Sequence, residues 1–146
     1  MEPSHIVLVA CAASKRREQS AARDLYVSTL FKEARRYAES VSDRWYILSA
    51  LHMVLDPGRI IDPYEQTLNE MPIALRRQWA DKVNDQLLAI LPAGAKLTIL
   101  AGKTYREFTE PMLRRSGFDV HIPLAHLGIG RQIQWLQQVN ASSTQR

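Results

Sequence analysis

Five polar or reactive residues follow the first apolar segment of the chain: Cys11, Ser14, Lys15, Arg16 and Arg17. In one interpretation they form a pocket for an anion or a base, in which backbone N–H groups and the Lys15 ammonium face a phosphate or a polar ring. In the other they form a solvated basic loop above a buried structural cysteine. The sequence leaves both interpretations open. The loop has no GxxxxGK[ST] motif, which argues against a P-loop nucleotidase.

A serine and a histidine, Ser49 and His52, follow the second apolar segment with a spacing of three residues. A histidine directly beyond a buried strand can act as an acid, a base or a hydrogen-bond donor. It can also merely cap the loop. We expect a functional role for His52, because its position and its residue type agree.

The loop that contains His52 continues with Asp56, Asp62, Pro63, Tyr64 and Glu65. A Pro-Tyr step can present a rigid aromatic face for stacking on a planar base. The alternative is a tyrosine that closes the core beneath the loop. Neither interpretation is favoured by the residues alone.

Two later loops combine glycine with polar residues. Gly102, at the exit of the third apolar segment, allows the backbone to approach a ligand closely, and Tyr105 follows it. The fourth loop has two glycines before Arg131 and Gln132, and it could hold a phosphate or simply turn the chain. The histidines show no metal-ligand spacing, so we expect neither a metal nor a cofactor.

Apolar strands and amphipathic helices must position these loops. Continuous rather than alternating hydrophobicity predicts strands that are covered on both faces, as in a parallel sheet. We expect such strands at residues 6–11, 45–50, 97–101 and 119–123. Apolar residues at helical spacing predict helices at 26–40, 73–91, 105–115 and 131–139.

This order predicts an α/β fold, a three-layer α/β/α sandwich with a mostly parallel four-stranded sheet. Residues 1–140 are expected to form a single domain, followed by a frayed tail at 141–146. Residues 51–72 lack a regular period, and loops of that length are usually functional. Since ligands of open α/β sheets bind beyond the carboxyl ends of the strands, the four loops above are the candidate site.

Composition narrows the class of protein. The formal net charge of +4 suits a polyanionic partner such as nucleic acid, although many proteins with this charge bind none. The single cysteine excludes an intrachain disulfide and a CxxC zinc site, and it fits a reducing cytoplasm. No apolar segment approaches the length of a membrane span, so we expect no membrane association.

Several motifs occur together: CAASK, ARDLYVSTLF, WYILSALHMVLDP, IIDPYEQTL, AGKTYREF and LGIGRQIQWL. In this order they resemble a family of small bacterial and phage proteins catalogued as a domain of unknown function. The family looks like a compact relative of the YaaA peroxide-stress proteins and of a domain in archaeosine synthase. Its layout is similar to that of the uracil-DNA glycosylase superfamily. The resemblance covers nearly the whole chain and implies base chemistry on nucleic acid.

The resemblance also implies site residues. The Cys-x-x-x-Lys step of the family falls on Cys11 and Lys15, and its Ser-Ala-x-His step on Ser49 and His52. One departure is Met53, because a glycine usually follows the histidine. The other matching positions are Asp24, Tyr26, Ser28, Pro63, Tyr64, Gly102 and Tyr105.

The implied activity is that of a DNA glycosylase, which hydrolyses the N-glycosidic bond of a modified pyrimidine such as 5-hydroxymethyluracil. Lys15 or His52 would donate to the base oxygen, and Asp24 or Asp62 would orient water or stabilise the sugar cation. The alternatives are a DNA-binding protein without chemistry and a nucleoside-processing transferase. The remaining roles are stacking by Tyr64 or Tyr105, pocket lining by Cys11, Ser14, Ser49 and Gly102, and phosphate contacts by Arg16, Arg17, Arg131 and Gln132.

Overall fold

The computed structural model describes residues 4–144 and contains the predicted parallel strands. They are β1 (His5–Ala10), β3 (Arg44–Ser49), β6 (Lys96–Leu100) and β7 (Asp119–His121). The central residues of β1 and β6 are buried, because helices cover both faces of the sheet. Val9 of β1 lies opposite both Ile47 and Leu100, so the carboxyl ends of three strands meet at one edge.

The sheet has five strands rather than the four that we predicted. The additional strand, β4 (Met53–Leu55), pairs antiparallel with β3, and the order is β4-β3-β1-β6-β7. It lies in the segment that was expected to be irregular. Three residues are too short to show a strand period. The turn before β4 depends on Met53, whose φ of 59° is the left-handed conformation that glycine adopts most readily. A glycine, which the resemblance leads us to expect at this position, would adopt this conformation without strain.

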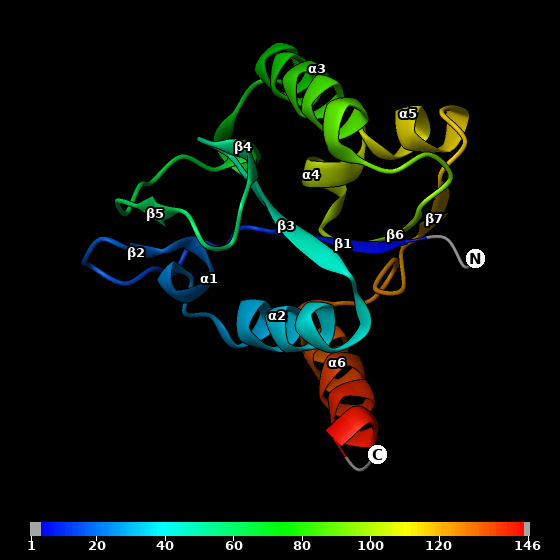
Figure 1. Ribbon diagram of the computed structural model, residues 1–146. Helices are drawn as coiled ribbons and strands as arrows, with labels where there is room; N and C mark the ends of the chain where they lie inside the picture. Colours follow the sequence, from blue (N-terminus) through cyan, green and yellow to red (C-terminus); the bar gives the residue numbers. More distant parts are fainter. Residues whose placement is uncertain (1–3, 145–146) are drawn as a thin grey trace.

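Helices form a layer on each side of the sheet, as predicted (Figure 1). One layer contains α2 (Thr29–Val41) and α6 (Ile129–Thr144), and the other contains α3 (Ile73–Ile90) and α5 (Glu110–Arg115). Each layer has its own apolar core, because the strand side chains alternate between the two faces. None of the helices in residues 4–144 is long and apolar enough to cross a membrane.

The helix predicted at 26–40 begins later, at Thr29. The Ser28 side chain caps α2 by accepting a hydrogen bond from the N–H of Phe31 at 3.1 Å. Tyr26 therefore lies outside α2, just after the short helix α1 (Ala22–Leu25), and its side chain is buried. The helical spacing of its neighbours had placed it in the wrong element.

The segment 51–72 contains further short elements. Strand β5 (Ile60–Ile61) pairs antiparallel with β2 (Ser20–Ala21), and the 3₁₀ helix η1 (Leu68–Glu70) follows. Figure 1 shows the β2–β5 pair beside α1, away from the central sheet. The segment is thus a structured border of the predicted site rather than an irregular loop.

Two helix predictions also differ from the structure. The helix expected at 105–115 is divided into α4 (Lys103–Arg106) and α5, with Pro111 in the first turn of α5, where its missing N–H does no harm. Helix α6 is longer than predicted and includes residues 141–144 of the tail expected to fray. Asn140 docks it on α2 by donating to the Glu33 carbonyl and carboxylate. Residues 145–146 lie outside the described residues.

Candidate functional site

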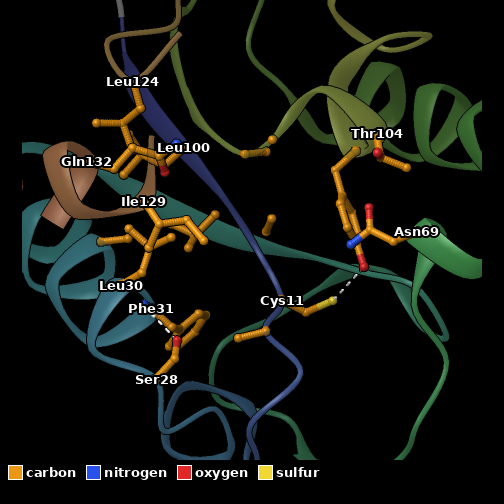
Figure 2. Close-up of a pocket in the computed structure, with 17 residues that line it drawn as sticks. Cys11, Ser28, Leu30, Phe31, Asn69, Leu100, Thr104, Leu124, Ile129 and Gln132 are labelled. Carbon is orange, nitrogen blue, oxygen red and sulfur yellow. Dashed lines mark hydrogen bonds between the residues drawn. The ribbon is translucent and has the colours of Figure 1, made fainter. Parts of the chain in front are cut away.

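A cavity of about 340 Å³, which we call the apolar chamber, opens between α2, α6 and the carboxyl ends of β1 and β6. Figure 2 shows Leu30, Phe31, Leu124 and Ile129 on one side, Asn69 and Thr104 on the other, and Cys11 between them. Most of the wall is hydrocarbon, with a few polar side chains at its edges. They include Ser28, Asn69, Thr104 and Gln132.

A second cavity of about 400 Å³, the charged cleft, adjoins the apolar chamber. Its lining includes one ammonium group, on Lys15, and two carboxylates, on Glu65 and Glu70. The two cavities share part of their lining. The shared residues are Cys11, Ala12, Asn69 and Tyr105.

Lys15 extends from the first loop into the charged cleft. Its Nζ donates to the Ala13 carbonyl at 3.3 Å and lies 4.5 Å from the centroid of the Tyr64 ring, a cation–π distance. Within residues 4–144 no carboxylate comes within 4.0 Å of Lys15 Nζ. Burial lowers the pKa of Lys15, and nearby Glu65 opposes this shift. The cation is therefore held in the cleft without an ion-pair partner.

Three buried hydroxyl groups form a chain behind the cleft. Ser49, which is 0% exposed, accepts from the N–H groups of Leu51 and His52 at 3.2 and 2.9 Å. Its Oγ lies 2.8 Å from the Tyr64 hydroxyl, which also bonds the Tyr26 hydroxyl. Since the Ser49 oxygen already accepts two hydrogen bonds, the Ser49 hydroxyl is the donor in its bond to the Tyr64 hydroxyl. Burial raises the pKa of both tyrosines, so both remain protonated.

The hydrogen bonds among these three hydroxyls decide between the two interpretations of Tyr64, stacking on a base or closing the core. The side chain is 9% exposed, its hydroxyl points to Ser49 and Tyr26, and Lys15 lies over its ring. Little of the ring is available for stacking on a base, so the residue closes the core beneath its loop. It also supports the Lys15 ammonium.

His52 lies beside Tyr64 and outside the residues that line the two cavities. Its ring packs edge-on against the Tyr64 ring, with 5.5 Å between centroids, and its N–H binds Ser49. Burial and, to a smaller extent, Arg59 lower the pKa of His52, so the ring is neutral near pH 7. This position suits a residue that holds Tyr64 in place better than one that contacts a ligand.

Cys11 and Tyr105 lie at the junction of the two cavities. The Cys11 thiol donates to the Tyr105 hydroxyl at 3.5 Å, and that hydroxyl also accepts from the N–H of Leu68 at 3.3 Å. Tyr105 is 7% exposed and packs edge-on against Trp79. Burial raises the pKa of Tyr105 to about 12. Both residues line the site, and Tyr105 fastens η1 to it.

The two predicted catalytic carboxylates lie elsewhere. Asp24 forms an ion pair with Arg35 at 2.8 Å, which joins α1 to α2. Asp62 is exposed and accepts a long bond of 3.4 Å from Gln19. Neither lines the apolar chamber or the charged cleft. The carboxylates that do line the cleft are Glu65, next to Tyr64, and Glu70, the last residue of η1.

The other predicted residues divide into two groups. Gly102 and Gln132 line the apolar chamber, and Gln132 donates from Nε2 to the Leu127 carbonyl at 2.7 Å. The exposed residues Ser14, Arg16, Arg17 and Arg131 lie outside both linings.

Asn69 and Glu70 line the site but were not predicted from the sequence. Their only signal was their place in an unusually long loop. The part of the chain that the structure describes holds no cluster of three His, Cys, Asp or Glu suited to a metal ion.

Comparison with known proteins places the chain in a family. Over 127 residues it is 32% identical to the uncharacterized protein YfjM of Bacillus subtilis (strain 168), a match that covers 80% of this chain and 78% of YfjM. No solved structure matches the chain significantly. Residues 6–138, nearly the entire fold described above, match DUF6884. The chain therefore belongs to DUF6884, a family of unknown function.

Proposed function

We propose that the protein binds a nucleoside unit of a nucleic acid or nucleotide and hydrolyses its N-glycosidic bond. The observation that carries the proposal is the division of the site into an apolar chamber and a charged cleft with one shared wall. A nucleoside has the same division, because a flat base is joined to a hydroxylated sugar. The resemblance of the motifs to a family related to YaaA proteins, with a layout similar to that of the uracil-DNA glycosylase superfamily, suggests the same chemistry.

In this arrangement the base occupies the apolar chamber. Ser28 uses an oxygen lone pair to cap α2, so its O–H remains free to donate to the base. Gln132 donates from its amide nitrogen to Leu127, which leaves its amide oxygen free to accept. Asn69 offers both kinds of group, because its side-chain amide has no partner among residues 4–144. These groups could read the polar edge of a base.

The sugar then lies in the charged cleft, beside the carboxylates. When the bond from C1′ to the base nitrogen breaks, its electron pair leaves with the base and positive charge develops on the sugar. Glu65 or Glu70 stabilises this cation. A water molecule adds to C1′ and gives a proton to the carboxylate, and the departing base takes up a proton from a hydrogen-bond donor in the chamber or from solvent.

The direct test measures base release. The protein is incubated in excess with oligonucleotides and free nucleosides that carry uracil, thymine, 5-hydroxymethyluracil or other modified pyrimidines, and released bases are identified by mass spectrometry. We expect release from at least one substrate. Glu65→Gln or Glu70→Gln should lower the rate by roughly a hundredfold or more, as expected for loss of a positioned acid–base group.

Asp62→Asn is the matched control, because it also neutralises an exposed carboxylate of the same segment but lies outside the cleft. It should leave the rate unchanged. No base release from any substrate would contradict the proposal. Salt-dependent DNA binding without release would instead support a DNA-binding protein, and transfer of a sugar between free bases would support a nucleoside transferase.

A further inference from the structure

The loop after β1 presents consecutive backbone donors without acceptors. Cys11 N–H still binds the Leu48 carbonyl in the sheet, and Arg16 N–H binds the Leu25 carbonyl. Between them, the N–H groups of residues 12–15 have no acceptor in the described part of the chain. Ala12, Ala13 and Lys15 line the charged cleft. N–H groups without an acceptor at the wall of a cleft are free to donate to an anion bound there.

The Lys15 ammonium lies over the same loop. Its one hydrogen bond goes to the Ala13 carbonyl, so two of its three N–H donors are unused, and the described residues give it no ion pair. The Tyr64 ring holds Nζ at the cleft, with 4.5 Å between Nζ and the ring centroid. The Lys15 cation and the acceptor-free N–H groups of Ala12 and Ala13 therefore belong to residues that line the same charged cleft.

We propose that this loop, residues 12–15, is a phosphate subsite, in which the backbone N–H groups and Lys15 Nζ bind the phosphate of the ligand. The inference rests on the proposed function for the rest of the ligand, since it places base, sugar and phosphate in sequence along the site. The substrate is then a nucleotide unit rather than a free nucleoside. Lys15 contacts the phosphate, and not the base oxygen that the sequence had suggested.

The carboxylates of the cleft set the strength of this subsite. Glu65 and Glu70 lie at the same cleft as Lys15 and repel an anion, although neither is within 4.0 Å of its Nζ. An isolated phosphate should therefore bind weakly, and neutralising Glu65 should strengthen its binding. A solvated basic loop with no site would not show this dependence.

The test reads the loop amides directly by NMR. A uniformly labelled protein is titrated with inorganic phosphate at constant ionic strength. We expect the amide resonances of residues 12–15 to shift with a saturable dependence on phosphate. Lys15→Met should weaken binding roughly tenfold or more, as for removal of a charge-assisted contact, and Glu65→Gln should strengthen it.

Lys82→Met is the matched control, because Lys82 is an exposed lysine on α3 that lines neither the charged cleft nor the apolar chamber. It should leave phosphate binding unchanged. The absence of saturable shifts at residues 12–15 would overturn the subsite, and so would equal binding by the wild type and Lys15→Met. An equal loss in both lysine variants would also overturn it, since it would show a general charge effect.

Two further titrations identify the source of the phosphate. A nucleoside monophosphate and a short DNA strand are compared with inorganic phosphate, and stronger binding of either, with the same loop shifts, identifies it as the source. The phosphate titration does not depend on turnover. If the loop shifts appear but no base is released, the subsite stands and the proposed hydrolysis fails. If base is released but Lys15→Met binds phosphate normally, the proposed hydrolysis stands and the phosphate subsite fails.

Discussion

The two ends of the parallel sheet differ in whether their polar groups have hydrogen-bond partners. At the amino end, His5 Nδ1 lies 3.0 Å from the Val41 carbonyl, His5 Nε2 lies 2.8 Å from Thr98 Oγ1, and the His5 N–H donates to Asp43. At the carboxyl end, the N–H groups of residues 12–15 have no acceptor in residues 4–144. A cavity of about 490 Å³ is lined by Lys96 and Thr98 of β6, away from the carboxyl end of that strand, so cavity volume alone does not mark the candidate site. Unused hydrogen-bonding capacity does.

The difference has a physical reason. A buried polar group without a partner costs about 1–3 kcal/mol, which explains why the polar groups of His5, which serve only the fold, are paired. Unpaired donors and acceptors persist where water or a ligand can reach them. The amino end therefore holds the fold together, and the carboxyl end is available for binding. Substitutions at the two ends should separate stability from function.

The largest effect on stability is expected at Ser49, which supports both the fold and the candidate site. Ser49→Ala removes the acceptor of the Leu51 and His52 N–H groups and the donor to Tyr64, all in a fully buried position. We expect the free energy of unfolding to fall by about 2 kcal/mol, measured by urea denaturation. Phosphate binding should weaken as well, because Tyr64 supports Lys15. A stable variant with normal binding would show that the hydroxyl chain does not support the site.

Much of the fold could be predicted, because the pattern that marks each main strand lies within one short segment of the sequence. The apolar segments of β1, β3 and β6 are continuous enough to mark buried parallel strands, and their order defines the crossovers and the edge where loops meet. The short β4 could not be found, because its three residues depend on the Ser49 turn and on the unusual backbone of Met53.

The site was predicted less well, because its walls come from distant parts of the chain. Cys11, Lys15 and Gly102 follow strands directly, so the ends of β1 and β6 place them in or beside the cavities. Glu65 follows Tyr64, whose hydroxyl bonds Ser49, and no sequence pattern reveals that contact. Asp24 had the right residue type, but Arg35 holds it elsewhere.

The next prediction tests the apolar chamber alone. An added Cβ at Gly102 meets no atom within 4 Å, and its φ of −69° suits any residue, so Gly102→Leu should fill part of the chamber without unfolding the protein. We expect base release to fall at least tenfold, a change of about 1.4 kcal/mol, with phosphate binding unchanged. Gly128→Leu is the control, because Gly128 has the same free space but lies outside the chamber. Equal rates in both variants would show that the base does not occupy the chamber.

A smaller effect on stability alone is expected at the amino end. Because the Val41 carbonyl only accepts, His5 donates from Nδ1 and its Nε2 accepts from Thr98. Thr98→Val keeps the side-chain shape but leaves His5 Nε2 without a donor. The free energy of unfolding should fall by about 1 kcal/mol, with phosphate binding and base release unchanged. A loss of either activity would mean that the amino end takes part in function.

The smallest effect is a pH dependence of stability, to which one histidine at each end of the sheet contributes. Burial is the main cause that lowers the pKa of both His5 and His52, with Lys96 contributing at His5 and Arg59 at His52. Both rings are therefore neutral in the folded protein at pH values where the unfolded chain, with an ordinary histidine pKa near about 6.5, begins to bind protons. Stability is then fully present above that pKa and falls as the pH is lowered toward the folded values.

Urea denaturation between about pH 8 and pH 5 should show this fall, which spans the ordinary histidine range. Asp119, whose pKa is lowered by its hydrogen bond to His121, acts only at more acidic pH and leaves this window clear. His5→Gln should flatten part of the dependence without affecting phosphate binding, because all its contacts are at the amino end. His52→Gln should flatten another part and also weaken phosphate binding, because His52 packs against the tyrosine that holds Lys15. If both variants changed binding equally, the separation between a structural end and a binding end would be wrong.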